Sequence, residues 1–407
     1  MSLETMNPTD FAFWNLDSAE RDSYFARIRK AARAEPLDVA GVEGTFYALA
    51  RHDDVAEASR RPELFSSEPI ATSLADPPEA ARRFFGAMIS MDDPRHARLR
   101  RIVSRAFTPR MIGGLRGTIE REAVRIADDL ADRGPCDFVE HVARPLPLFV
   151  ICTMMGIPEE RYGAVLEASE IILAMGDPGF VPPDGRDRVT VMAEKFGILH
   201  GMMAELAAER RERPADDLVT ALVNADVDGQ ALTAEELGKL FGLLVVAGTE
   251  TTRTTLSHVL TLLTEHEEQR ELLLSGLDER LPGTVEESLR YASPVSWMRR
   301  TLTRDLDFAG RSLREGDRVL LYYCSANRDE LAFHDPGRFD ITRSPNPHVA
   351  FGAPGPHFCL GANLARLELT TLLRELFTRF PGLHAAAAPV RQPSTFVNGV
   401  ARLDCAF

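Results

Sequence analysis

The stretch Phe351-Gly-Ala-Pro-Gly-Pro-His-Phe-Cys359-Leu-Gly361 carries one cysteine near the end of a glycine- and proline-rich loop. Good helix formers follow from Ala362 to Phe377, with apolar residues at three- and four-residue spacing. We therefore expect Cys359 at a helix start, where unpaired amides and the positive end of the helix dipole favour anionic sulfur. The thiol is a candidate metal ligand that should ionise more readily than a free thiol.

A cysteine that only fills space in the core is the common alternative. Core packing does not explain the three glycines and two prolines between Phe351 and Gly361, whereas a backbone that passes beneath a flat cofactor does. Structural zinc needs four protein ligands, and no CxxC or HxxxH pairing lies nearby. One thiolate without companion ligands fits heme iron.

These residues resemble the cytochrome P450 family, whose signature is F-x-x-G-x-[HR]-x-C-x-G followed by a helix. Phe351 lies eight residues before Cys359, one more than the common pattern has. This longer loop and its lead-in, Asn346-Pro-His-Val-Ala, resemble members that hydroxylate sterol side chains and branched lipids. The resemblance implies that Phe351, His357, Cys359 and Gly361 bind heme b (iron protoporphyrin IX), with Cys359 as the iron ligand.

The same resemblance implies a mainly α fold with small β sheets, made of a helix-rich part and a smaller β-rich part. Heme is expected between a long central helix and the helix after Cys359. Helices are predicted at 18–34, 115–133, 191–213, 233–265 and 359–380. Strands are predicted at 45–50, 305–309 and 318–323, with a short pair within 394–407. Two stretches rich in proline and glycine, 66–90 and 175–187, are interpreted either as lids or as plain surface connectors.

Composition indicates an ordinary globular protein, with net charge −14, 44% hydrophobic and 27% charged residues. No linker or repeat divides the chain, so residues 1–407 are expected to form one domain. The acidic balance argues against a nucleic-acid partner, and no apolar run of roughly 18 residues could serve as a membrane anchor. The first residues lack a signal sequence, and the five scattered cysteines suggest reduced thiols. We therefore expect a cytoplasmic protein.

The predicted long helix opens with the capping-box spacing Thr233-Ala-Glu-Glu236 and has Ala247-Gly-Thr-Glu250-Thr251 at its centre. A glycine in a helix interior costs about 1 kcal/mol relative to alanine. This segment resembles the family motif A-G-x-[DE]-T, which implies that Ala247 lies against the cofactor. Gly248 is then expected to let the helix approach the cofactor or to widen its backbone locally around a water. The motif also implies that Glu250 and Thr251 are catalytic and manage protons during dioxygen activation. Alternatively, Thr251 bonds its own backbone and Glu250 is a surface acid.

Two further groups of charges match the family pattern. Glu287 and Arg290 form E-x-x-R on one helix face, and the resemblance implies that they join Arg338 in a buried ion network beneath the cysteine loop. Glu287 could instead complete a capping box with Thr284. Asp93 and the following proline are predicted as N-cap and first residue of a helix. By resemblance, the heme propionates are bound by His96, Arg100, Arg300 and His357, with Arg299 as a substitute for Arg300.

A solvated basic face is the alternative interpretation of that arginine-rich helix. Its neighbours make the stretch basic in an acidic protein, which suggests a docking patch for an acidic electron donor such as ferredoxin. These neighbours are Arg95, Arg98, Arg101, Arg105 and Arg110. The implied electron chain runs from NAD(P)H through ferredoxin reductase and ferredoxin.

The resemblance implies a monooxygenase that inserts one oxygen atom from O₂ into a C–H bond. The expected walls of the substrate pocket are apolar, which favours a lipophilic molecule such as a sterol, terpenoid or branched fatty chain. They comprise Val246, Ala247, Val295, Met298 and Val397. Alternatives are a macrolide or aromatic biosynthetic hydroxylase, a peroxide-driven peroxygenase, and a heme-thiolate protein without enzymatic activity.

Overall fold

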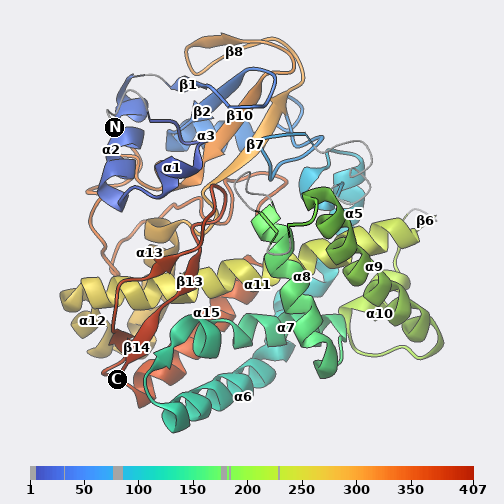
Figure 1. The fold of residues 1–407 in the computed structure, drawn as a ribbon, viewed down its shortest axis with the longest axis vertical. Coiled ribbons are helices and arrows are strands. Elements are labelled where there is room, and N and C mark those ends of the chain that lie inside the picture. Colours follow the sequence, from blue (N-terminus) through green and yellow to red (C-terminus); the bar gives the residue numbers. More distant parts are fainter. Residues whose placement is uncertain (1–5, 32, 77–85, 176–180, 183–184, 228–229) are drawn as a thin grey trace.

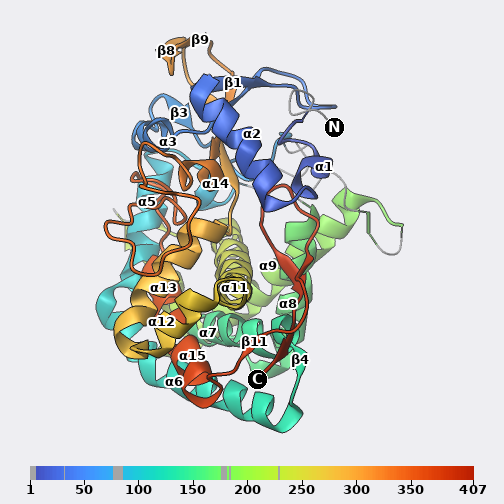
Figure 2. The same ribbon diagram turned by 90° about the vertical axis from the view of Figure 1, so that its left-hand side faces the viewer.

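The computed structural model describes residues 6–31, 33–76, 86–175, 181–182, 185–227 and 230–407. A β-rich part built from the N-terminal segments and residues around 300–320 lies at the top of the view in Figure 1, and a larger helical part lies below it. The long helix α11 (Ala234–Glu265) crosses the middle of the molecule between them. Figure 2 shows α11 nearly end-on at the centre, surrounded by other elements.

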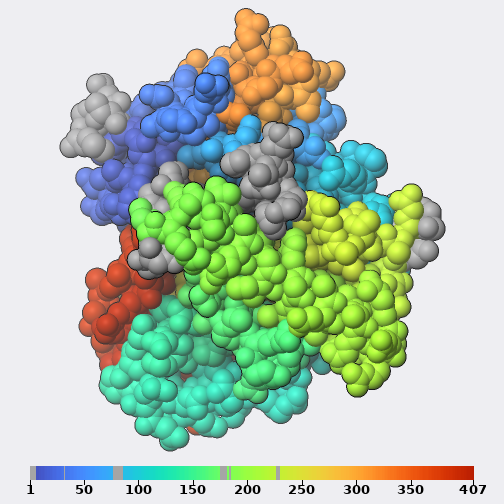
Figure 3. Space-filling model, turned by 45° about the vertical axis from the view of Figure 1, so that its right-hand side comes forward, coloured from blue at the N-terminus to red at the C-terminus, as the bar shows by residue number. Residues whose placement is uncertain are grey.

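Helices make up most of the described chain, as the sequence predicts. Those of the helical part are α5 (Arg95–Val103), α6 (Pro109–Arg133), α7 (Pro145–Met155), α8 (Tyr162–Met175), α9 (Arg188–Glu212), α10 (Leu218–Val223), α12 (Glu267–Leu274), α13 (Leu277–Ala292) and α15 (Ala362–Arg379). Those beside the sheet are α1 (Phe11–Trp14), α2 (Ser18–Ala31), α3 (His52–Arg60) and α14 (Tyr323–Ala326). In the space-filling view, α8 and α9 (green) form the front between the β-rich part and the teal α6–α7 region (Figure 3).

The largest sheet has five strands in the order β1-β2-β10-β7-β3. They are β1 (Ala34–Leu37), β2 (Phe46–Leu49), β10 (Arg318–Tyr322), β7 (Trp297–Leu302) and β3 (Phe65–Ser66). Only the β2–β10 pair is parallel; the others are antiparallel. The sheet thus joins residues near 46 to residues near 318, and β7 carries Arg300 toward the helical part.

Smaller sheets complete the fold. The first is three-stranded, in the order β11 (His384–Ala385), β14 (Asp404–Ala406), β4 (Cys136–Asp137). The pairs are β12 (Val390–Arg391) with β13 (Val400–Arg402), β8 (Leu306–Phe308) with β9 (Arg311–Leu313), and β5 (Asp226–Val227) with β6 (Gln230–Ala231). Two strands, β13 and β14, lie within 394–407, but the expected pairing between them is wrong: β13 pairs with β12, and β14 pairs with β11 and β4.

The core explains why α11 is central. Its apolar residues belong to one large cluster with α6, α7, α9, α13 and α15, so the helix is covered on several sides. Thr233 caps its start: the Thr233 hydroxyl accepts from the N–H of Glu236, and the Glu236 carboxylate accepts from the N–H of Thr233. This is the capping box that the sequence predicts.

Element boundaries differ from expectation at a few points. The first long helix ends at Ala31, and Ala34 already pairs in β1. The helix after Cys359 begins at Ala362, with Gly361 as N-cap. Pro94, not Asp93, is the N-cap of α5; the Asp93 carboxylate accepts from the N–H of Ala97 instead. Parts of both expected lid stretches, residues 77–85, 176–180 and 183–184, lie outside the described residues.

A search of the described helices finds none whose length and apolar character would let it cross a bilayer.

Candidate active site

The cysteine loop is held by its own backbone. The N–H of Cys359 donates to the carbonyl of Phe351 at 2.8 Å, which closes the eight-residue loop, and the N–H of Gly352 donates to Val349 at 2.9 Å. Gly352 has φ +82°, a conformation that favours glycine. A Cβ on Gly355 would lie 2.2 Å from the carbonyl oxygen of Ser59, so only glycine lets the loop approach α3 this closely.

The Cys359 side chain is accessible, yet protein atoms surround much of it. Crowding by protein atoms raises the pKa of the thiol, while the N–H of Gly361 and the guanidinium groups of Arg100 and Arg366 lower it. The net direction is upward, so the expectation of easier ionisation at a helix start is wrong for the free thiol. Cys359 lies two residues before the N-cap, and a bound metal would deprotonate it directly.

Cationic side chains from three elements meet beside the loop. His96 and Arg100 come from α5, Arg300 from β7 and His357 from the loop itself. The rings of His96 and His357 lie 4.2 Å apart, and Arg100 donates to the carbonyl of Phe358 at 2.6 Å. The structure therefore brings together the four residues that the sequence nominated as propionate partners.

This cluster fits the acidic groups of heme. Burial, assisted by Arg300, His96 and Arg100, lowers the pKa of His357 to about 2, and burial with the charge of Arg100 also lowers the pKa of His96. The buried Nε2 atom of His96 has no hydrogen-bond partner among the described residues. Asp93 lies 3.4 Å from His96, and the charge of Asp92 also acts on this ring. Two guanidinium groups, from Arg100 and Arg300, and two neutral imidazole rings that can donate hydrogen bonds are suitable partners for two propionates.

Space beside the sulfur also fits a flat group. A Cβ added to Gly361 would meet no atom within 4 Å, and its N–H is directed at the Cys359 sulfur. Ala247 is exposed although it lies in the middle of the long helix. The residues present around the loop thus match a heme held at Cys359.

Arg299 does not substitute for Arg300. Successive residues of a strand point to opposite faces, and the Arg299 guanidinium pairs with Asp76 and donates to the carbonyl of Leu74 at 2.8 Å. Arg300 instead donates to the carbonyl of Arg299 at 2.7 Å and is close enough to His357 to lower its pKa. Arg299 therefore fixes the segment before residue 77 to the sheet.

Thr251 and Ala247 lie on the accessible face of α11. Val246, Ala247 and Thr251 are accessible, whereas Thr249 and Glu250 are buried. The Thr251 hydroxyl donates to the carbonyl of Ala247 at 3.0 Å, as the simpler alternative for this residue predicted. Accessible positions inside an otherwise buried helix indicate that this face borders an internal space.

Glu250 is not a surface acid. It is 4% exposed and forms a buried ion pair with Arg253, one turn further along α11. Arg253 also reaches Glu170 of α8 at 3.3 Å, and Glu170 pairs with Arg144 at 2.9 Å. Burial raises the pKa of Glu250, and the charge of Arg253 opposes this. The acid is thus the inner end of a chain of charges that reaches the partly exposed Glu170.

The glycine of this motif faces another way. A Cβ on Gly248 would lie 3.2 Å from side-chain atoms of Ile151, so the residue permits close packing of α11 on α7. The helix remains α-helical through this region. The sequence had suggested that Gly248 allows approach to the cofactor or a widened helical turn; the packing on Ile151 accounts for it instead.

Two of the expected substrate contacts lie side by side. Val295 and Val397 form an isolated antiparallel bridge, and the N–H of Ser296 donates to the carbonyl of Phe396 at 2.8 Å. Met298 follows on β7 and is partly buried. The C-terminal loop and the segment before β7 are therefore neighbours, and the role of these residues in binding substrate stays a prediction.

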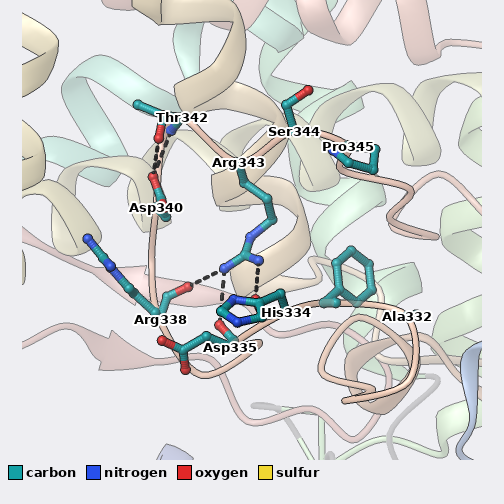
Figure 4. Close-up of a pocket in the computed structure, with 10 residues that line it drawn as sticks. Ala332, His334, Asp335, Arg338, Asp340, Thr342, Arg343, Ser344 and Pro345 are labelled. Atoms are coloured by element: carbon teal, nitrogen blue, oxygen red, sulfur yellow. Dashed lines mark hydrogen bonds between the residues drawn. The ribbon is translucent and has the colours of Figure 1, made fainter.

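The ion network beneath the loop contains a different third arginine. Glu287 and Arg290 are fully buried and paired at 2.7 Å. The second guanidinium on Glu287 belongs to Arg343, at 3.1 Å, so the prediction of Arg338 is wrong for the side chain. Arg338 contributes its carbonyl oxygen to Arg290 and Arg343, while its exposed side chain points away from them (Figure 4).

A surface cavity of about 330 Å³ opens beside this network, lined by residues between Ala332 and Pro345 (Figure 4). None of its lining residues is among the expected substrate contacts. The guanidinium of Arg343 forms part of its wall and donates to the carbonyls of His334 and Asp335. We interpret the cavity as a surface depression where this loop folds around Arg343. Cys359 does not line it.

Sequence reasoning also missed Glu368 on α15. It is 3% exposed, its Oε2 atom has no partner among the described residues, and burial raises its pKa well above the usual range. The residue lies between Leu367 and Leu369, both buried. An acid within such an apolar run was the available signal.

An accessible thiol before a helix, a cluster of two arginines and two histidines beside it and a polar interruption in the central helix are typical of a heme-thiolate protein of mainly helical fold. The chain belongs to the cytochrome P450 family: the family model "Cytochrome P450" matches residues 44–392. Proteins of this family are monooxygenases that use heme, O₂ and redox partners.

Several characterised relatives cover nearly the whole chain. Proteins named methyl-branched lipid omega-hydroxylase from Mycobacterium bovis and Mycobacterium tuberculosis are 43% identical over 401 residues, covering 96% of this chain and 92% of the relative. A steroid C26-monooxygenase from Mycolicibacterium smegmatis is 36% identical over 406 residues, covering 97% of this chain and 92% of the relative. The expected resemblance to the subgroup of branched-lipid and sterol hydroxylases is confirmed.

Solved structures of cytochromes P450 share this fold along nearly the whole chain. A Mycobacterium marinum cytochrome P450 in complex with pseudoionone superposes with a TM-score of 0.91 at 39% identity, covering 98% of this chain and 97% of that chain. A cytochrome P450 of the Bacillus subtilis bacillaene polyketide synthase superposes with a TM-score of 0.86 at 31% identity, with 99% of each chain covered.

Proposed function

We propose that this protein hydroxylates the end of a methyl-branched lipid chain or of a sterol side chain, with heme b held by Cys359. The observation that carries the proposal is the accessible Cys359 thiol, with His96, Arg100, Arg300 and His357 gathered beside its loop. The names of the relatives support the substrate class. The paired apolar segments around Val295 and Val397 support a lipophilic substrate.

When bound, heme supplies the redox chemistry that activates O₂. Cys359 would bind its iron as a thiolate, and the N–H of Gly361 would stabilise the charge on the sulfur. Arg100 and Arg300 would pair with the propionates, and His96 and His357 would donate hydrogen bonds to them. The loop closure between Cys359 and Phe351 keeps the sulfur in one position.

Protons would be managed by α11. The Thr251 hydroxyl donates to its own helix in this structure, and rotation about one side-chain bond would free it to donate toward the internal space. Glu250 would accept and release a proton behind it, since burial raises its pKa while Arg253 opposes this. Arg253 and Glu170 extend from Glu250 toward solvent and would connect the acid to the surface. Val246, Val295 and Val397 would exclude surplus water and hold the substrate.

Electrons would come from an acidic ferredoxin that docks on the basic surface of α5 and the segment after it. Arg95, Arg101, Arg105 and Arg110 are exposed there. Arg98 is only partly exposed, and its guanidinium binds the carboxylate of Glu236 at 2.7 Å, so we do not count it in the docking surface. A ferredoxin reductase would supply the ferredoxin from NAD(P)H.

Substrate titration followed by product analysis tests the function. Purified protein reconstituted with hemin should show the red-shifted ferrous carbonyl absorption of thiolate ligation, and branched fatty acids or cholestenone-type sterols should shift the Soret band. With ferredoxin, reductase and NADPH, the product should carry a terminal hydroxyl. Spin-state changes with macrolides but none with lipids would reject the substrate class. Turnover with peroxide but none with the ferredoxin system would reject the electron source.

A further inference from the structure

Two adjacent acids on α13 serve different clusters. Glu287 binds Arg290 and Arg343 in the network described above. Its neighbour Glu286 points to the cysteine loop and α15, where it meets Arg366 and His348. Glu286 belongs neither to the E-x-x-R motif nor to the ion network of Glu287.

The contacts of Glu286 are specific. Arg366 binds both of its oxygens, with Nε to Oε1 at 2.6 Å and a terminal nitrogen to Oε2 at 2.8 Å. The Nδ1 atom of His348 accepts from the N–H of Ala350 at 3.2 Å, so a neutral His348 ring carries its proton on Nε2 and donates it to Glu286 at 3.0 Å. One carboxylate thus fixes two side chains from different segments.

Both side chains lie against Phe351. The Arg366 guanidinium lies over the Phe351 ring at 4.5 Å from its centre, and the His348 ring centre is 5.9 Å from it. The carbonyl of Phe351 accepts the N–H of Cys359 at 2.8 Å. Movement of Phe351 would therefore be transmitted directly to the backbone of Cys359.

The charge of Glu286 acts on Arg366, and the charge of Arg366 acts on Cys359. Burial alone would raise the pKa of Glu286, but hydrogen bonds from Arg366 and His348 bring the pKa down to about 2, so the acid is ionised. The Arg366 charge in turn is one of two guanidinium charges that lower the pKa of the Cys359 thiol. Glu286 itself has no such direct effect, so any influence on the sulfur passes through Arg366.

We propose that Glu286 is a positioning residue that holds Arg366 and His348 around Phe351 and thereby places a positive charge beside the Cys359 thiolate. The inference rests on the proposed function, since the reduction potential is its main measurable consequence. A positive charge near the sulfur favours the ferrous over the ferric state, because reduction adds negative charge. If the Arg366 guanidinium moves away from the sulfur, the ferric–ferrous equilibrium should therefore shift toward the ferric state.

The test compares four variants by spectroelectrochemistry of the hemin-loaded protein. Arg366→Gln removes the charge, and we expect a several-fold shift toward ferric, where a tenfold shift of this one-electron couple equals 59 mV. Glu286→Gln makes the net charge more positive, so net charge alone predicts a shift toward ferrous; positioning predicts a shift toward ferric. Glu286→Asp keeps the charge but shortens the reach, and should shift the equilibrium less, in the same direction as Arg366→Gln.

Asp278→Asn is the matched control. Asp278 binds Arg374 at 2.6 Å and joins the same two helices, α13 and α15, at an exposed site away from the loop. The ferric–ferrous equilibrium of Asp278→Asn should equal that of the wild type. Should Glu286→Gln fail to retain heme, Arg366→Gln and Glu286→Asp carry the test through their potentials and ferrous carbonyl spectra.

The outcomes separate this inference from the function on which it rests. A wild-type protein that never shows the thiolate-type carbonyl absorption refutes the proposed function. A wild type that shows it, with Glu286→Asp and Arg366→Gln indistinguishable from Asp278→Asn, refutes the inference alone. A shift of Glu286→Gln toward ferrous also refutes it, because net charge would then suffice.

Discussion

Thr251 and Glu250 are neighbours in the chain, yet their side chains serve different sides of α11. Consecutive residues of a helix are about 100° apart around its axis. The Thr251 hydroxyl lies on the accessible face and donates to the carbonyl of Ala247, whereas the Glu250 carboxylate is buried and bound to Arg253. Proton delivery between them would therefore need water or a change of side-chain rotamer, which gives the two residues separable roles.

Replacing Thr251 by alanine should uncouple the enzyme. The variant should keep its Soret spectrum, because the hydroxyl donates to its own helix, at the carbonyl of Ala247. Without the hydroxyl, general acid–base assistance is lost, which typically contributes 10²- to 10⁴-fold; we expect product per NADPH to fall at least several-fold while peroxide rises. The measurement is product and peroxide yield at matched NADPH consumption.

Thr249→Ala is the control for that experiment. Thr249 makes the same kind of bond, from its hydroxyl to the carbonyl of Val245 at 3.1 Å, but it is buried on another face. Its coupling should remain close to that of the wild type. Equal uncoupling in both variants would mean that helix distortion, rather than the Thr251 hydroxyl, is responsible.

Arg343 should matter more to stability than Arg338. Arg343→Gln leaves a charge on the fully buried Glu287 with one partner fewer, and breaking such a buried pair costs about 3 to 5 kcal/mol of unfolding free energy. Arg338→Gln changes an exposed side chain and should cost within about 0.5 kcal/mol. Urea unfolding and heme content measure both, and Glu287→Ala should lose heme or fail to fold. Equal losses in the two arginine variants would contradict the geometry.

Much of the fold was predictable because its signals are local. The capping box at Thr233 and the helical spacing after Cys359 depend on nearby residues only. The family motifs added the meeting of His96, Arg100, Arg300 and His357, which no local pattern contains. The β13 and β14 partners were not predictable, since pairing with β12 and β4 depends on how distant segments meet.

The predictions that were wrong depended on contacts between segments that are distant in the sequence. Arg338 and Arg343 both follow the same turn, and only the path of that loop decides which guanidinium reaches Glu287. The pKa of Cys359 was expected to fall from the helix start alone, but crowding outweighs the Gly361 N–H. Gly248 was assigned to the cofactor, although its neighbour is Ile151 on another helix.

Acid should destabilise the protein partly through His258. The Nε2 atom of His258 is 2.7 Å from the carbonyl of Asn398, and burial, with Arg391 and Arg21 nearby, lowers its pKa from 6.5 to about 4. The folded-state pKa is depressed, so the unfolded chain binds the proton first. Stability from this group is complete above pH 6.5 and decreases as the pH falls toward 4. The loss is up to about 3 kcal/mol.

His258→Gln tests this assignment. Glutamine can still donate to Asn398 but does not titrate in this range. The free energy of unfolding, measured by urea denaturation between pH 7 and 4, should therefore fall less steeply for the variant than for the wild type. Parallel curves would show that other groups, such as His357, carry the acid sensitivity.

The basic surface after α5 should control electron delivery. Arg105 and Arg110 are exposed and lie on the same arginine-rich stretch, so reversing both charges in Arg105→Glu/Arg110→Glu should slow reduction by an acidic ferredoxin about tenfold at low salt. The rate should also become less sensitive to salt, since screening acts on the attraction that has been removed. Arg304→Glu/Arg314→Glu makes the same charge change at the β8–β9 end of the molecule and should reduce normally (Figure 1). Stopped-flow reduction of the ferric protein under carbon monoxide gives the rates. If both double variants slow equally, the overall charge of the protein, rather than a docking patch on this face, governs the encounter.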